Sequence, residues 1–281
     1  MQAAILQTRP IFGDKAGNLE RAQALLEKEL KAPNLSAESH PHPEPDLIVL
    51  PELFATGYLF QAKEELQKAA EPAQKAEYGE TTSCLIDIAK KHNCIINAGI
   101  AELGEKGKIF NSSVLVSPAG LLGVYRKVHL FGDEKKYFSP GRQPFPVFET
   151  KVGRLGLIVC FDWAFPEAIR TLALKGAQII CHPANLVLPF CQQAMITRSV
   201  ENRVYILTAN RVGTDEREGD TKLTFTGASQ ALSPGGKVLG RLGTNEEGLF
   251  VAEVDPTLAD NKFINEQNDL MADRVPELYE L

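Results

Sequence analysis

The residues with the clearest capacity for covalent chemistry surround Cys160, in the stretch GLIVCFDWAFPEAIRTLALKG over 156–176. The apolar run before the cysteine predicts a buried strand, and Pro166 and Gly176 are typical of the start and the end of a helix. A thiol near a helix N-terminus faces unpaired N–H groups and the positive end of the dipole, which both favour thiolate. The alternative is a small buried hydrophobic residue, as we expect for Cys84, Cys94, Cys181 and Cys191.

A nucleophilic thiol needs a base, and histidine, the usual partner, is scarce in this sequence. Only His129 and His182 lie in segments with predicted structure, and no GxSxG motif offers a serine nucleophile instead. Glu52 stands at the end of the apolar run DLIVLPEL, where a carboxylate is rare unless it is paired or functional. Burial would raise its pKa and allow it to accept a proton near neutral pH.

Lys127 is equally unusual, because it ends an apolar strand in YRKVHLF. A fixed cation beside an acid and a thiol can stabilise an anionic oxygen. The alternative is that Glu52 and Lys127 form a buried ion pair with a structural role only. Glu134, seven residues after Lys127, is either part of the same cluster or a loop carboxylate.

The composition excludes several classes of protein. The 281 residues carry a net charge of −6 without a basic run, which argues against nucleic acid as a partner. No apolar stretch reaches the roughly 18 residues of a membrane span, and MQAAILQTRP lacks the cationic region of a secretion signal. Five cysteines without CxxC spacing predict neither a disulfide framework nor a zinc site, so we expect a reducing cytoplasm.

Strands and helices alternate along the chain, which favours one layered α/β domain. Apolar runs and turn residues predict strands over 3–8, 46–53, 94–103, 152–160, 177–184 and 205–213. Amphipathic patterns predict helices over 18–30, 165–176 and 191–204, and most of 61–92 as helical. Residues 31–45 form a polar, proline-rich loop, and 257–281 are weakly periodic, as in a frayed tail or an arm that docks on a partner.

A Ser-Pro-x-Gly turn occurs twice, as SPAG over 117–120 and as SPGG over 233–236. Each turn lies between two predicted strands, so each unit is expected to be a hairpin. The repetition is either a trace of two similar halves or a coincidence of two turns.

Three motifs together resemble the signatures of the nitrilase, or carbon–nitrogen hydrolase, superfamily. Glu52 lies in LPELFATGY, Lys127 in YRKVHLF and Cys160 in CFDWAFPEAIR, in the family's order. The segments YFSPG and HPAN add to the resemblance, which extends over residues 1–281.

The resemblance implies a four-layer αββα sandwich with two pseudo-symmetric halves and a Glu-Lys-Cys triad. It makes Glu52 the general base, Cys160 the nucleophile and Lys127 the cation that stabilises the tetrahedral intermediate, with the backbone N–H of Phe161. It places Glu134 beside the cysteine to orient the substrate or the lysine. It implies no metal or organic cofactor, and a homodimer in which residues 257–281 cross to the partner subunit.

The resemblance leaves the substrate open among small aliphatic amides, aliphatic nitriles, ω-amides and N-carbamoyl amines. Asp162 in CFDW, where typical nitrilases have Glu, favours the amidase-like branches. The segments CFDWAFPE, ALKGA and HPANLV, however, also resemble short members described as nitrilases for small aliphatic nitriles. Pocket candidates are Tyr58, Phe131, Trp163, His182, Asn185 and Leu186, of which Trp163 and Phe131 suggest a narrow apolar wall. An acyl or amine transferase and a non-catalytic scaffold are the alternatives; a transferase would need an acceptor pocket, and a scaffold would have no use for the triad.

Overall fold

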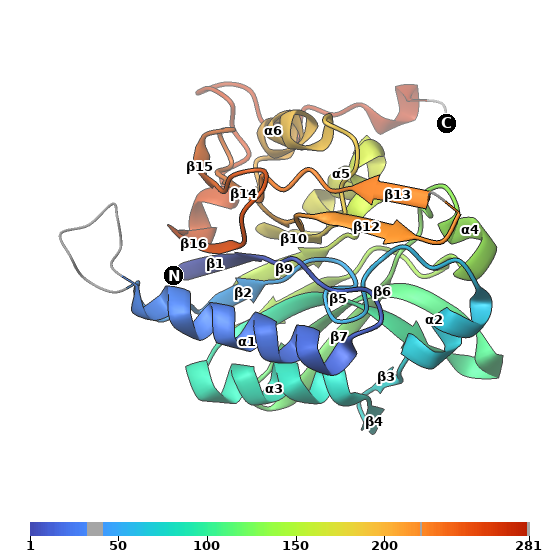
Figure 1. The fold of residues 1–281 in the computed structure, drawn as a ribbon. Helices are drawn as coiled ribbons and strands as arrows, with labels where there is room; N and C mark the ends of the chain where they lie inside the picture. Colours follow the sequence, from blue (N-terminus) through green and yellow to red (C-terminus); the bar gives the residue numbers. More distant parts are fainter. Residues whose placement is uncertain (33–41, 220, 280–281) are drawn as a thin grey trace.

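Two six-stranded sheets lie face to face in the computed structural model, which describes residues 1–32, 42–219 and 221–279 (Figure 1). In spatial order, the first sheet consists of β16 (Gly248–Glu253), β1 (Gln2–Gln7), β2 (Leu47–Val49), β5 (Ile95–Leu103), β6 (Ile109–Ser117) and β7 (Gly120–Arg126). The second consists of β15 (Val238–Arg241), β14 (Gln230–Leu232), β11 (Tyr205–Ala209), β10 (Ile179–Pro183), β9 (Gly153–Leu157) and β8 (Val147–Thr150).

Helices cover the outer face of each sheet (Figure 1). The first sheet is covered by α1 (Lys15–Lys31) and α3 (Glu80–His92), and the second by α5 (Pro166–Leu174) and α6 (Cys191–Asn202). Two shorter helices, α2 (Lys63–Ala69) and α4 (Glu134–Tyr137), lie near the ends of the first sheet. The expected αββα sandwich is therefore confirmed.

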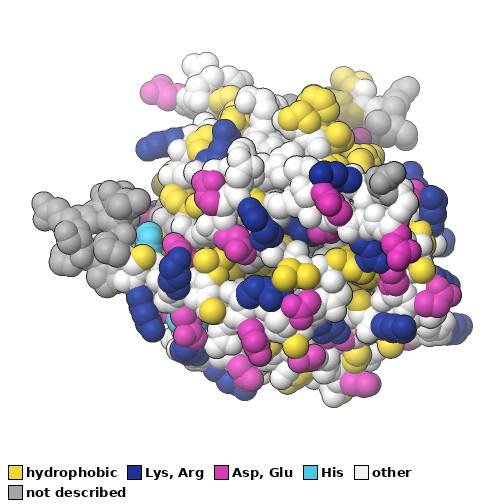
Figure 2. Space-filling model, viewed as in Figure 1, with side chains coloured by type: hydrophobic (Ala, Val, Ile, Leu, Met, Phe, Trp, Pro, Cys, Tyr) yellow, Lys and Arg dark blue, Asp and Glu magenta, His cyan; other side chains and the backbone are white. Residues whose placement is uncertain are grey.

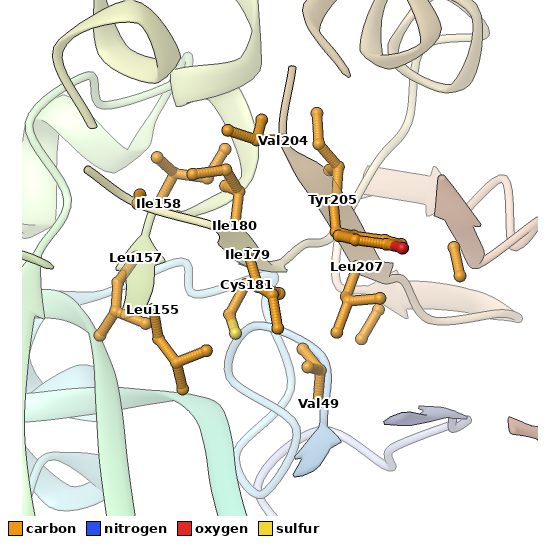
Figure 3. Packing of buried hydrophobic residues seen from close by; sticks show 14 of the residues in the cluster. Val49, Leu155, Leu157, Ile158, Ile179, Ile180, Cys181, Val204, Tyr205 and Leu207 are labelled. Atoms are coloured by element: carbon orange, nitrogen blue, oxygen red, sulfur yellow. The ribbon is translucent and has the colours of Figure 1, made fainter. Parts of the chain in front are cut away.

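The alternation of side chains along the strands explains the layers. In β1, Ala3 and Ile5 join the core between the sheets, whereas Ala4 and Leu6 pack with the helices on the outer face. Figure 3 shows the core between the sheets, where Val49 of the first sheet faces Leu155 and Leu207 of the second. Both faces of these strands are buried, so the strands read as continuous apolar runs.

The two halves of the chain repeat one topology. In the first sheet β1, β2 and β5 are parallel, and β5 is followed by the antiparallel hairpin β6–β7. In the second, β9, β10 and β11 are parallel, and β11 is followed by the antiparallel hairpin β14–β15. The SPAG turn joins the two strands of the β6–β7 hairpin, and the SPGG turn joins those of the β14–β15 hairpin. Their recurrence thus reflects two similar halves.

Two predicted elements differ from the structure. The segment 61–92 is not mostly helical: α2 ends at Ala69, and a small hairpin of β3 (Ala73–Gln74) and β4 (Glu77–Tyr78) precedes α3. Pro72 lacks the N–H that a continuing helix requires. The strand predicted over 46–53 is only Leu47–Val49, because Pro51 cannot donate to a ladder and the chain turns at Leu53.

Other expectations fall in less regular regions. Much of the loop predicted over 31–45 lies outside the described residues, and α1 extends to Lys31. The segment from 257 contains the 3-10 turns Pro256–Ala259 and Pro276–Leu278 and passes over the α5–α6 side of the molecule (Figure 1). In the described ranges, no helix is long and apolar enough to cross a membrane. On the face drawn in Figure 2, positive and negative side chains are interspersed.

Candidate active site

Glu52 lies in a tight turn directly after β2, at the end of the first sheet. Leu53, the next residue, has a φ of 50°, which few residues other than glycine adopt. The turn packs against Gly99 of β5, where an added Cβ would lie 2.4 Å from the Cα of Glu52. Only glycine at position 99 therefore allows the backbone of Glu52 to approach β5 so closely.

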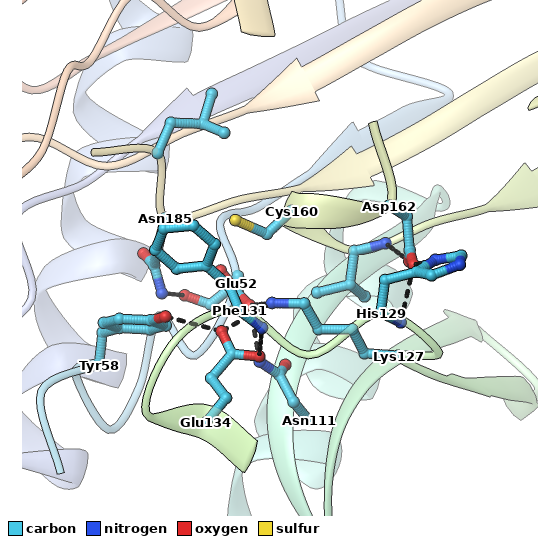
Figure 4. A network of polar contacts seen from close by, with 12 residues as sticks. Glu52, Tyr58, Asn111, Lys127, His129, Phe131, Glu134, Cys160, Asp162 and Asn185 are labelled. Carbon is cyan, nitrogen blue, oxygen red and sulfur yellow. Dashed lines mark hydrogen bonds and ion pairs between the residues drawn. The ribbon is translucent and has the colours of Figure 1, made fainter. Parts of the chain in front are cut away.

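Lys127 follows β7 at the same end of the sheet and is completely buried. Its Nζ donates to Glu52 Oε1 at 2.9 Å and to Glu134 Oε1 at 2.7 Å (Figure 4). Burial alone would lower the pKa of this lysine, but the negative charges of Glu134 and Glu52 raise it above its usual value. Lys127 therefore stays protonated and links the two carboxylates.

Glu134 is the first residue of α4 and is buried beside Lys127. The Tyr58 hydroxyl donates to its Oε1 at 2.7 Å, and the Phe131 backbone N–H donates to its Oε2 at 3.2 Å. These contacts leave Glu134 in one orientation, with one oxygen on Lys127. It is a member of the buried cluster, which settles the choice left open by the sequence.

Glu52 has one oxygen engaged and one oxygen free. Asn111 of β6 donates to its Oε1 at 2.6 Å, the same atom that accepts from Lys127. Its Oε2 is buried and has no hydrogen-bond partner among the described residues. Burial is the largest influence on the pKa of Glu52 and raises it, although Lys127 partly opposes the change. Glu52 thus has the free oxygen and the raised pKa that a proton shuttle requires.

Cys160 begins a short 3-10 helix, η2 (Cys160–Ala164), that separates β9 from α5. Its φ of 41° is unusual for a residue with a side chain and marks a strained turn. The helix α5 starts at Pro166, as predicted, and η2 lies between Cys160 and this helix. Burial and the charge of Glu52 raise the pKa of the thiol well above its ordinary value, although Lys127 lowers it. The resting thiol is therefore protonated and needs a base.

Two side chains, Asp162 and His182, hold the strained turn by hydrogen bonds. Asp162 accepts hydrogen bonds from the Val159 backbone N–H at 2.9 Å and from the Tyr125 hydroxyl at 2.8 Å. His182 Nε2 lies 2.9 Å from the Cys160 carbonyl oxygen, and its Nδ1 lies 3.1 Å from the Thr208 hydroxyl. Because a carbonyl oxygen can only accept, Nε2 carries the proton.

The Cys160 thiol opens into a narrow pocket with a cavity volume of about 20 Å³. Its lining is mostly apolar and comprises Phe131, Cys160, Phe161, Trp163, Asn185, Leu186, Val187 and Leu188. Asn185 also joins the two halves of the chain, because its Nδ2 donates to the Glu52 carbonyl oxygen at 2.9 Å. The pocket suits a small substrate with an apolar chain.

Comparison with known proteins decides the family. The carbon–nitrogen hydrolase family model matches residues 2–261. The chain belongs to this family. It is 43% identical to a nitrilase of Pyrococcus abyssi, over 99% of both chains, and 33% identical to an (R)-stereoselective amidase of a Pseudomonas species, over 91% of this chain and 85% of the relative.

Solved structures of hydrolases in this superfamily have the same fold. One is a member of branch 10 of the nitrilase superfamily from Saccharomyces cerevisiae, with a TM-score of 0.78, 28% identity and 92% of each chain covered. Another is a mutant amidase from Nesterenkonia sp. AN1 that carries the acetamide moiety of fluoroacetamide on its active-site cysteine, with a TM-score of 0.76 and 26% identity over 99% of this chain and 95% of that one.

Most of the site residues predicted for this carbon–nitrogen hydrolase come together. Glu52, Lys127 and Glu134 form one hydrogen-bonded chain, and all three influence the pKa of Cys160. Phe131, Phe161, Trp163, Asn185 and Leu186 line the pocket at the thiol. Two candidates do not line this pocket. Tyr58 lines the adjacent pocket and donates to Glu134, and the ring nitrogens of His182 contact the Cys160 carbonyl and the Thr208 hydroxyl.

Sequence reasoning missed several residues that support this carbon–nitrogen hydrolase site. Asn111 was detectable as a polar residue in the buried strand IFNSSVLV. Asp162 contacts the nearby Val159 and also Tyr125 and His129, which are far away in the sequence. No local sequence pattern predicts the contacts with Tyr125 and His129. Of the four cysteines expected to be buried, Cys94, Cys181 and Cys191 are, whereas Cys84 is partly exposed.

The burial of His182 predicts a pH dependence of folding stability. Burial lowers its pKa to about 4, below the ordinary value of 6.5, so the unfolded chain binds a proton there first as the pH falls. The contribution of neutral His182 to the free energy of unfolding is therefore fully present above pH 6.5. It decreases by about 3 kcal/mol as the pH falls to 4. Urea unfolding of the wild type and of His182→Gln at several pH values measures the difference. If the free energies of unfolding of the two proteins change with pH in parallel, the prediction is wrong.

Proposed function

We propose that this chain hydrolyses small aliphatic amides or nitriles, with Cys160 as nucleophile, Glu52 as general base and acid, and Lys127 as the cation that stabilises the tetrahedral intermediate. The observation that carries the proposal is Glu52 Oε2, which is buried and has no hydrogen-bond partner in the described part of the chain. Lys127 and Asn111 fix this carboxylate near the protonated thiol of Cys160. Glu134 holds Lys127 from the other side and is a positioning residue.

The first half of the reaction forms a thioester. Glu52 takes the proton of the Cys160 thiol while the sulfur bonds to the substrate carbon, and the carbonyl π electrons move to oxygen. Lys127 and the backbone N–H of Phe161 stabilise this oxyanion. Glu52 then passes the proton to the substrate nitrogen, the C–N bond breaks, and ammonia leaves.

The second half restores the enzyme. Glu52 removes a proton from water while the oxygen attacks the thioester, and it returns that proton to sulfur as the C–S bond breaks. A nitrile follows the same route through a thioimidate, with one more water consumed. One group serves in both directions, which explains a carboxyl whose pKa is raised towards the working pH.

The C-terminal segment 257–281 bears on the oligomeric state. We propose that residues 1–281 form a single domain of a cytoplasmic homodimer, with 257–281 docked on the partner subunit. Support comes from exposed apolar side chains of that segment, which are between 47% and 74% exposed: Leu258, Phe263, Ile264 and Leu278. Sedimentation velocity measures the effect of Phe263→Asp with Ile264→Asp, which is expected to weaken the dimer; an unchanged dimer would contradict the docked arm.

Ammonia release from a substrate panel tests the proposed activity. The wild-type enzyme is assayed with propionamide, propionitrile, an ω-amide and an N-carbamoyl amine. The narrow apolar pocket predicts kcat/KM at least about tenfold higher for the short amide or nitrile than for the two larger polar substrates. A preference for the N-carbamoyl amine, similar to the N-carbamoylputrescine amidases among the relatives, would replace the proposed substrate class.

A further inference from the structure

A second and larger pocket adjoins the one that contains the thiol. It has a cavity volume of about 310 Å³, and aromatic and apolar residues form most of its wall: Tyr58, Leu59, Phe60, Phe131, Tyr137, Phe138 and Leu223. It reaches the buried cluster through Glu134, which accepts from Tyr58. The proposed reaction of a short substrate makes no use of this space.

One residue, Phe131, belongs to the walls of both pockets. Its ring meets the Phe161 ring edge-on at 5.1 Å, and its backbone donates to Glu134 and accepts from the Glu134 N–H at 3.0 Å. In Figure 4 the Phe131 ring lies between the Cys160 thiol and Tyr58. The side chain is therefore a partition, held in place by aromatic packing and by backbone bonds that a substitution of its side chain would keep.

We propose that Phe131 determines substrate size by separating the acyl site at Cys160 from this second pocket, which would take a longer aliphatic or aromatic acyl chain once the ring is removed. The inference rests on the proposed function. The acyl chain is the appropriate occupant because the nitrogen of a primary amide leaves as ammonia and needs no pocket. Apolar walls suit such a chain, because the transfer of each methylene group from water to an apolar site is favourable.

Four enzymes assayed with propionamide and hexanamide test the partition. Phe131→Ala is expected to raise kcat/KM for hexanamide about tenfold or more and to lower it for propionamide, because the short substrate loses a wall. Adding Leu223→Phe to Phe131→Ala refills the second pocket and is expected to reverse the gain for hexanamide only. Phe190→Ala, which removes a ring that is 60% exposed, is the control and is expected to match the wild type.

Several outcomes would overturn the inference. They are an unchanged preference in folded Phe131→Ala, a gain that Leu223→Phe does not reverse, or a gain for N-hexylacetamide in place of hexanamide. If Phe131→Ala does not fold, Phe131→Leu is expected to shift the preference in the same direction, and no shift would count against the partition.

Alkylation of Cys160 separates this inference from the proposed function. The ratio of rates for 1-chloroheptan-2-one and chloroacetone, two thiol reagents that differ only in the length of the chain on the carbonyl carbon, is expected to rise about tenfold in Phe131→Ala without any need for turnover. A wild type that releases no ammonia while this ratio still rises would refute the proposed activity and retain the partition. Ammonia release with an unchanged ratio would do the opposite.

Discussion

Replacing Cys160 by alanine is expected to lower kcat/KM for ammonia release by about 10⁴-fold or more, because no other described group at the pocket can form the thioester. Among the described residues that line the pocket with the thiol, there is no other cysteine, serine or threonine. Water would have to attack directly, without the covalent step that divides the reaction in two. The change removes one sulfur atom, so folding stability is expected to change little.

Cys94→Ala is the matched control for this substitution. Cys94 is completely buried between α3 and the first sheet and has no part in the site. Its variant also removes one buried sulfur atom and is expected to keep its kcat/KM, whereas Cys160→Ala should lose it. Ammonia release from Cys160→Ala within about tenfold of the wild type would contradict the assignment of the nucleophile.

Lys127→Met is expected to impair both activity and folding. Methionine has a similar length but no charge, so Glu52 and Glu134 would face each other in a buried site without the cation that both contact. Breaking a buried ion pair from one side costs about 3–5 kcal/mol of folding stability. Loss of a group that stabilises the oxyanion costs about 10²–10³ in kcat.

The pH dependence of the folding stability of Lys127→Met tests whether repulsion between the two carboxylates causes the loss. Without the lysine, the two carboxyls would share a proton and their folded pKa values would exceed those of the unfolded chain. The destabilisation should therefore grow as the pH rises from 5 to 8, which urea unfolding measures. Lys136→Met, on a side chain that is 64% exposed beside Asp133, is the control and should leave both stability and activity nearly unchanged. A loss of stability independent of pH would contradict the cluster.

The fold and the central residues of the site were predictable from the sequence for different reasons. Strands that are buried on both faces, such as AQIICHPA, can be recognised as continuous apolar runs. Glu52, Lys127 and Cys160 each stand at the end of such a run. The three motifs in order then identified the family. The hairpins at SPAG and SPGG were predictable because their turn residues dictate a reversal of the chain.

Other features could not be predicted because tertiary contacts determine them. The hairpin of β12 (Thr214–Arg217) and β13 (Thr221–Thr224) contains few apolar residues, yet Leu223 lines the second pocket. The pKa of Cys160 was predicted in the wrong direction, since helix position suggested thiolate whereas burial among carboxylates favours the thiol. That error strengthens the role of Glu52, because a protonated thiol needs a base more than a thiolate does.

The central claim is that the buried carboxyl of Glu52, and no histidine, moves the protons of both half-reactions. The most direct measurement compares Glu52→Gln with the wild type for ammonia release and for alkylation of Cys160 by iodoacetamide. We predict that ammonia release falls by about 10³-fold or more, while Cys160 remains open to alkylation because Lys127 is still beside it. Ammonia release from Glu52→Gln within about tenfold of the wild type would contradict the claim.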